Sequence, residues 1–456
     1  MIARLEPEFM PMVKVINDFK EAVAKTENQP VVISVERNGG LMAVYKLDVY
    51  KENTGHDEEN YGIVERIIKT LLWAKGGFKV YVAGSKYIYD RIADDYRVGG
   101  AREFDFNFMA RVYEKPFEVI YVEKVEDAPN ENDASSPVGR HLDGCRIGFD
   151  AGGSDRKVSA VVDGETVYSE EVVWFPKLQE DPMYHYEGIL NAMKTAASHM
   201  PRVDAIGVSS AGVYIDNRIM VASLFLKVND EDFDKKVKNM YIDVAREIGE
   251  NIPIEVANDG DVTALAGAMS LNENGVLGIA LGTSEAAGYV DMDGNITGWL
   301  NELAFAPVDF NKDAMVDEWS GDYGCGVKYF SQDGVIKLTP FAGIELDESL
   351  SPAEKLKVVQ GLMKEGDERA KAIYETIGVY FGYTIAYYCE FYDIKQVLIM
   401  GRVTSGKGGE ILLDRAKEVL AVEFPEIAKK VTLNIPDEKA RRVGQSVAAA
   451  SLPKLN

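Results

Sequence analysis

Cysteine and histidine are scarce in this sequence, with three of the former and four of the latter in 456 residues. The cysteines, Cys145, Cys325 and Cys389, are widely spaced and odd in number. This pattern argues against a disulfide framework and is typical of a reducing compartment. Because a structural zinc site needs closely spaced Cys and His ligands, we expect no zinc.

Positive charge is also in short supply, since 50 Lys and Arg stand against 74 Asp and Glu, a formal net charge of −24. Nucleic-acid binding needs clustered basic residues, so no nucleic-acid partner is expected. No apolar run is long enough to span a bilayer, and the N-terminus, MIARLEPEFMPMVKV, lacks the pattern of a secretory signal. We therefore expect a cytoplasmic protein with no membrane partner.

Hydrophobic residues, by contrast, make up 46% of the chain, enough for two or three domains with substantial cores. The segment 126–143 is acidic and rich in Pro, Ser and Asn, which predicts a linker. Strand-like and helix-like segments alternate after it, which predicts an α/β fold with a mostly buried sheet. Residues 1–125 form a separate small α/β domain in this interpretation.

Four loops after predicted strands carry glycine or acidic residues. Glycine lets backbone amides approach phosphate oxygens closely, but each loop alone is equally a β-turn or a helix cap. In the sequence Asn258-Asp259-Gly260-Asp261, one carboxylate serves either as a helix N-cap or as a general base at a strand end. The four loops are FDAGGSDRK (149–157), VANDGDV (256–262), ALGTSEAAG (280–288) and MGRVTSGKGGEI (400–411).

In this order the loops resemble those of the ROK family of sugar kinases and sugar-responsive regulators, within the actin-like ATPase superfamily. The resemblance covers about residues 145–452. It implies two actin-like (ribonuclease H-like) lobes, 144–257 and 258–456, with an ATP cleft between them. The matching segments are DAGGS, IGVSSAGVYID, VANDGDVTALAGA, LGTSEAAGYVDMDGNITGW and IMGRVTSGKGGEILLDRAKEVL.

The resemblance also assigns roles to residues, with ATP and Mg²⁺ as cofactors. Asp259 matches the catalytic base, Asp150 would hold Mg²⁺ through water, and Asp261 keeps the role of helix N-cap. The remaining residues implied are Asn258, Glu302 and Ser210 for the substrate, Gly152, Gly153, Ser154, Gly282, Thr283 and Ser284 for the ATP phosphates, and Gly401, Arg402 and Val403 for adenosine.

The chain departs from the family pattern in the expected sugar pocket. Phe305 and Val327 stand where the family carries a histidine and a glutamate, and Cys325 lacks the partner cysteines of the family's zinc cluster. Either the substrate is less polar on that face or catalysis has been lost. In the first loop, Asp155 places a carboxylate near the expected triphosphate, which requires compensation by Arg156 or Lys157.

Residues 1–125 do not resemble the basic helix-turn-helix of family regulators, which disfavours a DNA-binding repressor. Their order of strand, Gly-Gly turn, strand and helix repeats the order at 145–215, with Asn38-Gly39-Gly40 in the place of Ala151-Gly152-Gly153. Two interpretations remain, a degenerate duplication of the first actin-like half and an unrelated small α/β domain.

The leading hypothesis is ATP-dependent phosphorylation of a hydroxyl group on a sugar or sugar-like small molecule. The alternative is a non-catalytic sugar- or nucleotide-binding regulatory protein on the same scaffold. Asp259 and Asp150 favour the first, whereas Phe305 and Val327 favour the second. A homodimer is compatible with either.

Overall fold

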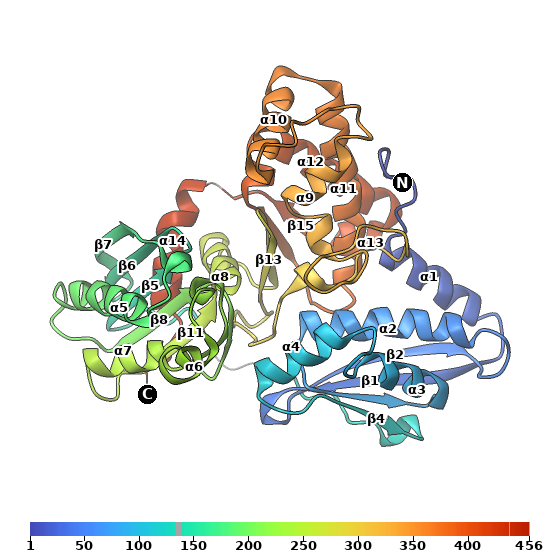
Figure 1. Cartoon of the computed structure of the whole chain (residues 1–456), viewed down its shortest axis with the longest axis horizontal. Helices are drawn as coiled ribbons and strands as arrows, with labels where there is room; N and C mark the ends of the chain where they lie inside the picture. The colour runs from blue at the N-terminus through green and yellow to red at the C-terminus, as the bar shows by residue number, and fades with distance from the viewer. Residues whose placement is uncertain (134–137, 437, 456) are drawn as a thin grey trace. The chain divides into compact units, whose positions relative to one another are not determined.

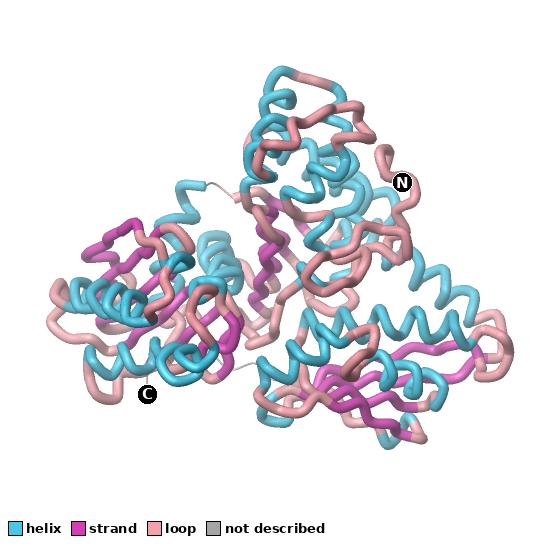
Figure 2. Tube along the Cα trace, in the orientation of Figure 1, coloured by secondary structure: helices cyan, strands magenta, loops and turns pink. Residues whose placement is uncertain are grey.

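The computed structural model describes residues 1–133, 138–436 and 438–455, without the side chains of 438–443, and has a mixed α/β fold (Figures 1 and 2). Residues 134–137 of the predicted linker lie outside the described residues. The chain divides into two compact units. Unit 1 comprises Met1–Ala134, Ile279–Ala287 and Trp299–Ile435, and unit 2 comprises Ser135–Gly278, Gly288–Gly298 and Pro436–Asn456.

Unit 2 is built on a five-stranded sheet with the order β11-β8-β5-β6-β7. Strands β5, β6 and β7 form an antiparallel meander, whereas β8 and β11 run parallel to β5. The carboxyl ends of β5, β8 and β11 therefore meet at one edge of the sheet. The strands are β5 (Cys145–Ala151), β6 (Asp155–Val162), β7 (Glu165–Val173), β8 (Ala205–Ser210) and β11 (Ile254–Asn258).

Helix α14 (Glu438–Ala450) packs on β5, β8 and α8. The approach is so close that a Cβ atom on Gly148 would lie 1.9 Å from the carbonyl oxygen of Ser446, and one on Gly207 would lie 1.7 Å from that of Ala449. Only glycine fits at these two strand positions. The other elements of unit 2 are α5 (Pro182–Ala197), β9 (Val213–Ile215), β10 (Arg218–Val221), α6 (Asp230–Asp232), α7 (Met240–Ile248) and α8 (Asp259–Leu271).

The N-terminal part of unit 1 is a four-stranded sheet with the order β2-β1-β3-β4 and covering helices. Here β3 runs antiparallel to β1, whereas the corresponding β8 of unit 2 runs parallel to β5. The two segments therefore differ in strand direction, and both interpretations of residues 1–125 stay predictions. The elements are α1 (Met12–Val23), β1 (Asn28–Glu36), β2 (Met42–Tyr50), α2 (Asp57–Ala74), β3 (Lys79–Ala83), α3 (Lys86–Asp95), α4 (Glu103–Tyr113) and β4 (Glu118–Val122).

The rest of unit 1 surrounds α11 (Glu368–Tyr388), a helix that is buried over most of its length. A second four-stranded sheet has the order β13-β12-β14-β15. Its strands β12 (Val276–Leu281) and β13 (Glu285–Val290) each continue from one unit into the other. The other elements are α9 (Gln332–Leu338), α10 (Pro352–Glu365), β14 (Gln396–Met400), α12 (Lys407–Glu423), α13 (Pro425–Ala428) and β15 (Thr432–Asn434).

The compact units divide the chain differently from the predicted lobes, whose boundaries stay a prediction. Helices α8 and α14, both in the predicted second lobe 258–456, belong to the unit that contains 144–257. The reason is packing, because both helices lie against the β5–β8–β11 part of the sheet. No helix in the described parts of the chain combines the length and apolar composition needed to cross a membrane.

Candidate functional site

Asp150 is the next-to-last residue of strand β5 and is 6% exposed. Its Oδ1 accepts a hydrogen bond from the Ser209 hydroxyl at 2.8 Å and one from Gln445 Nε2 at 3.5 Å. Burial raises the pKa of Asp150 to about 6, the Ser209 hydrogen bond and Lys157 lower it, and the charge of Asp259 raises it further. The carboxylates of Asp150 and Asp259 are therefore close enough for their charges to interact.

Asp259 is half-buried and opens helix α8, directly after β11. One carboxylate oxygen accepts a hydrogen bond from the Gly260 amide at 3.0 Å. Burial raises the pKa of Asp259, while the Gly260 amide and the charge of Lys177 lower it. A carboxylate with a raised pKa is a better proton acceptor than an ordinary surface aspartate.

The prediction that Asp261 caps this helix is wrong. Asn258 is the N-cap, because its Oδ1 accepts the Gly260 amide at 2.7 Å while its Nδ2 donates to the Gly212 carbonyl at 2.7 Å. The helix begins at Asp259, so Asp261 already lies in its first turn. There the buried Asp261 carboxylate accepts a hydrogen bond from the Tyr289 amide at 3.0 Å.

The glycine hairpin 152–154 joins β5 to β6 beside Asp150. Trp174 secures it, because the indole donates to the Gly152 carbonyl at 2.7 Å and the Trp174 amide donates to the Ser154 carbonyl at 3.1 Å. Lys177 lies over the hairpin, since a Cβ atom on Gly153 would lie 2.9 Å from Lys177 Cε. The hairpin, Asp150 and Asp259 thus lie in one unit with an exposed lysine that the sequence did not single out.

The compensation predicted for the first loop is present, because Lys157 Nζ lies 3.4 Å from the Asp155 carboxylate. Ser210, predicted to bind substrate, is fully buried and accepts a hydrogen bond from the Tyr241 hydroxyl at 3.0 Å. Successive side chains of a strand point to opposite faces, so it is Ser209 that reaches Asp150. The sequence shows the two adjacent serines, Ser209 and Ser210, but does not show which of them faces Asp150.

The other predicted nucleotide residues lie in unit 1. The Gly282 amide donates to the Ser284 carbonyl at 3.0 Å, and the Gly282 carbonyl accepts from the Gln332 amide at 2.9 Å. The side chains of Thr283 and Ser284 are exposed. A further group, Gly401, Arg402 and Val403, follows β14. Gly401 has φ 97° and a Cβ there would lie 2.2 Å from the Leu281 carbonyl oxygen, while the Val403 side chain is fully buried. The carbonyls of Gly401 and Arg402 accept hydrogen bonds from the Thr404 hydroxyl at 2.9 Å and from Gln360 Nε2 at 2.7 Å, whereas the Arg402 side chain is exposed.

In the region of the predicted sugar pocket, Glu302 and Phe305 contact Trp73 of helix α2 by a hydrogen bond and by ring packing. The Glu302 amide donates to the Trp73 carbonyl at 3.0 Å. The Phe305 ring lies 4.4 Å from that of Trp73 and 5.6 Å from that of Phe104. Phe305 therefore belongs to an aromatic cluster with α2 and α4, a packing role that the sequence did not indicate.

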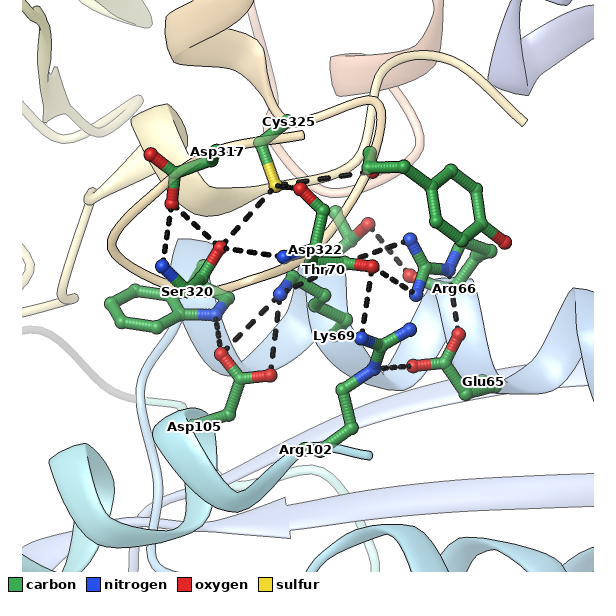
Figure 3. Close-up of polar contacts among 12 residues, drawn as sticks. Glu65, Arg66, Lys69, Thr70, Arg102, Asp105, Asp317, Ser320, Asp322 and Cys325 are labelled. Carbon is green, nitrogen blue, oxygen red and sulfur yellow. Dashed lines mark hydrogen bonds and ion pairs between the residues drawn. The ribbon is translucent and has the colours of Figure 1, made fainter. Parts of the chain in front are cut away.

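The loop that carries Cys325 is held by a buried ion-pair network (Figure 3). Asp322 pairs with Arg66 at 2.9 Å, Lys69 at 3.0 Å and Arg102 at 2.9 Å. Cys325 Sγ donates to the Asp322 carbonyl at 3.7 Å. In the described residues no group of three or more His, Cys, Asp or Glu side chains is arranged to hold a metal ion.

A pocket of about 830 Å³ lies elsewhere in unit 1, between α1, α2 and the loop after β13. It contains none of the predicted site residues. Charged side chains of both signs and aromatic side chains line it, among them Glu58, Arg91, Lys312, Tyr61 and Phe310. It is separate from the Asp150–Asp259 cluster, all of whose members belong to unit 2.

The sheet order and the acidic residues at the carboxyl ends of β5 and β11 define a protein with the actin-like α/β fold. The sequence profile of the ROK family matches residues 146–426, more than half of the chain. The chain belongs to the ROK family.

Two solved structures with TM-scores of 0.50 and 0.51 agree with this fold. The ROK hexokinase of Thermus thermophilus is 18% identical with a TM-score of 0.50, over 67% of this chain and 97% of its own. A ROK transcriptional regulator, a homologue of the Escherichia coli MLC protein, is 17% identical with a TM-score of 0.51, over 68% and 79%. A ROK glucokinase from Streptomyces griseus, solved with glucose and AMPPNP, is 19% identical with a TM-score of 0.46, over 67% and 99%. No curated protein sequence matched the chain.

Proposed function

We propose that this protein transfers the γ-phosphoryl group of ATP to a hydroxyl group of a sugar or sugar-like small molecule. The observation that carries the proposal is the meeting of Asp150, Asp259 and the glycine hairpin 152–154 in unit 2, with Lys177 beside them. Phosphoryl transfer needs positioned charges around the phosphates and one group that accepts the hydroxyl proton. Membership of a family that includes sugar kinases supports the assignment.

Each residue has a distinct role in this proposal. Asp259 accepts the proton of the acceptor hydroxyl, and burial keeps its pKa above that of a surface aspartate. The amides of the hairpin and the Lys177 ammonium face the phosphates. Asp150 would hold Mg²⁺, since this ion is commonly bound by one or two carboxylates, waters and substrate phosphates rather than by an all-protein cage. The ion would supply positive charge to the phosphate oxygens.

Binding of Mg-nucleotide is expected to weaken at acidic pH. The pKa of Asp150 is raised to about 6, so the carboxylate loses its charge as the pH falls through that value. We expect the affinity for Mg-AMPPNP to fall by up to about tenfold per pH unit below 6. Calorimetry from pH 5 to 8 measures this. The Asp150→Asn variant is the control, because any pH dependence it retains comes from protonation of the nucleotide. If its affinity for Mg-AMPPNP changed with pH as that of the parent does, the role of Asp150 in holding Mg²⁺ would be contradicted.

A non-catalytic binding role is the second candidate, and the Phe305–Trp73 contact favours it because an aromatic cluster occupies a position expected to bind substrate. An ATP-consumption screen over a panel of sugars and polyols, with Asp259→Asn as the control, separates the two. Acceptor-dependent ADP release that Asp259→Asn loses supports the kinase. Tight Mg-AMPPNP binding without transfer to any acceptor would favour the binding protein.

A further inference from the structure

Lys177 belongs to the 3₁₀ turn Pro176–Leu178 of unit 2, which lies against the glycine hairpin 152–154. A Cβ atom on Gly153 would lie 3.2 Å from Lys177 Nζ, and the charge of Lys177 lowers the pKa of Asp259. Among the described residues the Lys177 ammonium group has neither a hydrogen bond nor an ion pair. Its place beside the hairpin therefore depends on the turn that carries it.

His185 of helix α5 donates a hydrogen bond to the backbone of this turn. Its Nε2 atom lies 3.0 Å from the Pro176 carbonyl oxygen, which belongs to the peptide group that joins Pro176 to Lys177. The same atom lies 3.0 Å from the carbonyl oxygen of Leu224, in the contacting 3₁₀ turn Ser223–Phe225. Both carbonyls are acceptors, so Nε2 carries the proton and His185 ties the two turns together.

His185 is fully buried, and its ring packs on that of Phe225 with the centroids 4.6 Å apart. Burial lowers the pKa of His185, so the ring is neutral at neutral pH and supplies an N–H donor rather than a charge. The adjacent Tyr184 is a second support, because its hydroxyl accepts the Phe175 amide at 3.0 Å. A buried side chain cannot contact a phosphate group itself, so an effect of His185 on phosphate binding must pass through the turn.

We propose that His185, together with Tyr184, is a positioning residue that holds Lys177 beside the glycine hairpin, ready for a phosphate group of the nucleotide. This inference rests on the proposed function, which supplies the phosphate. A lysine held in place before the nucleotide binds loses less conformational entropy on binding than one on a free loop. Without the His185 hydrogen bonds the turn is free to move, so affinity falls although Lys177 is still present.

The test is a double-mutant cycle, measured by calorimetry of Mg-AMPPNP binding to the full-length protein. Lys177→Met should lower the affinity about tenfold, because it removes one charge-assisted contact. His185→Phe keeps a ring without an N–H donor and should lower the affinity by about threefold to tenfold. In the Lys177→Met background the same change should cost less than about twofold, because its effect passes through Lys177.

His185→Gln is the conservative variant, since its side-chain amide again offers an N–H donor, and it should recover most of the affinity that His185→Phe loses. His199→Gln, at an exposed position just after α5, is the matched control and should bind as the parent does. Melting temperatures check folding. Tyr184→Phe changes an exposed side chain, so it repeats the cycle even where His185→Phe fails to fold, and its smaller loss should also disappear in Lys177→Met.

A loss of affinity that is equal with and without Lys177 would overturn the inference, and so would unchanged affinity in His185→Phe and Tyr184→Phe. The outcome is separate from that of the proposed function. Phosphoryl transfer that both variants leave unchanged would keep the kinase and remove the positioning role. A Lys177-dependent loss of binding in a protein that transfers no phosphoryl group would do the reverse, and a parent that does not bind Mg-AMPPNP would overturn both.

Discussion

Asp259→Asn is expected to lower kcat by ~10²–10⁴ while leaving the melting temperature and the affinity for Mg-AMPPNP nearly unchanged. Asparagine cannot accept the hydroxyl proton. It retains the Oδ1 atom that accepts the Gly260 amide, and the helix keeps its cap because Asn258 provides it. The loss should therefore appear in turnover and not in stability.

The measurement is a coupled ADP-release assay with an acceptor found in the sugar panel, together with thermal melting. Asp230→Asn, at an exposed position of the same unit, is the matched control and should retain full activity. Full activity in Asp259→Asn would contradict the role of Asp259 as base. A large drop in melting temperature would instead assign Asp259 to the fold.

The sequence predicted the α/β fold and the acidic strand ends because both depend on local pattern. A buried apolar run followed by Asp-Ala-Gly-Gly or Asn-Asp-Gly-Asp places a carboxylate at the end of a strand whatever the rest of the chain does. The capping residue was assigned wrongly for the same local reason. Asn258 and Asp261 are both good N-caps, and only the position at which the strand ends selects Asn258.

Elements whose ends depend on distant contacts were harder to predict. The sequence indicates one helix over 232–250, but the structure has a break between the π-helical turn Phe233–Val237 and α7. At the break, the Lys238 carbonyl accepts a hydrogen bond from the Ile219 amide at 2.9 Å. The Lys238 carbonyl is therefore hydrogen-bonded to strand β10, whereas in a continuous helix it would accept a helical amide. No glycine or proline lies at this break, so the sequence gives no local signal of it.

The role of residues 1–125 could not be predicted at all, because it depends on pairs far apart in the chain. Phe305 packs on Trp73, and Asp322 binds Arg66, more than two hundred residues away in each case. Neither side chain carries a local signal of its partner. Together the two contacts bind the 302–325 segment to α2, which explains how that segment is held without a cysteine cluster.

Asp322→Ala is expected to lower the free energy of unfolding of this region by about 3–5 kcal/mol. The carboxylate is 2% exposed and pairs with Arg66, Lys69 and Arg102, of which Arg66 and Lys69 are themselves buried. Its removal leaves these cations without their shared anion. The ion pairs also lower the pKa of Asp322, so its stabilisation is present above the unfolded-state pKa of about 4 and is lost as the pH falls through the lower folded-state value.

Urea unfolding followed by tryptophan fluorescence measures this effect, because Trp73 lies in the same network and donates to Asp105 at 2.7 Å. Asp313→Asn, at an exposed position of the same loop, is the matched control and should change the unfolding midpoint little. Asp322→Asn should fall between the parent and Asp322→Ala, since it keeps an oxygen acceptor without the charge. An Asp322→Ala variant as stable as the Asp313→Asn control at neutral pH would show that the network does not hold the 302–325 segment on α2.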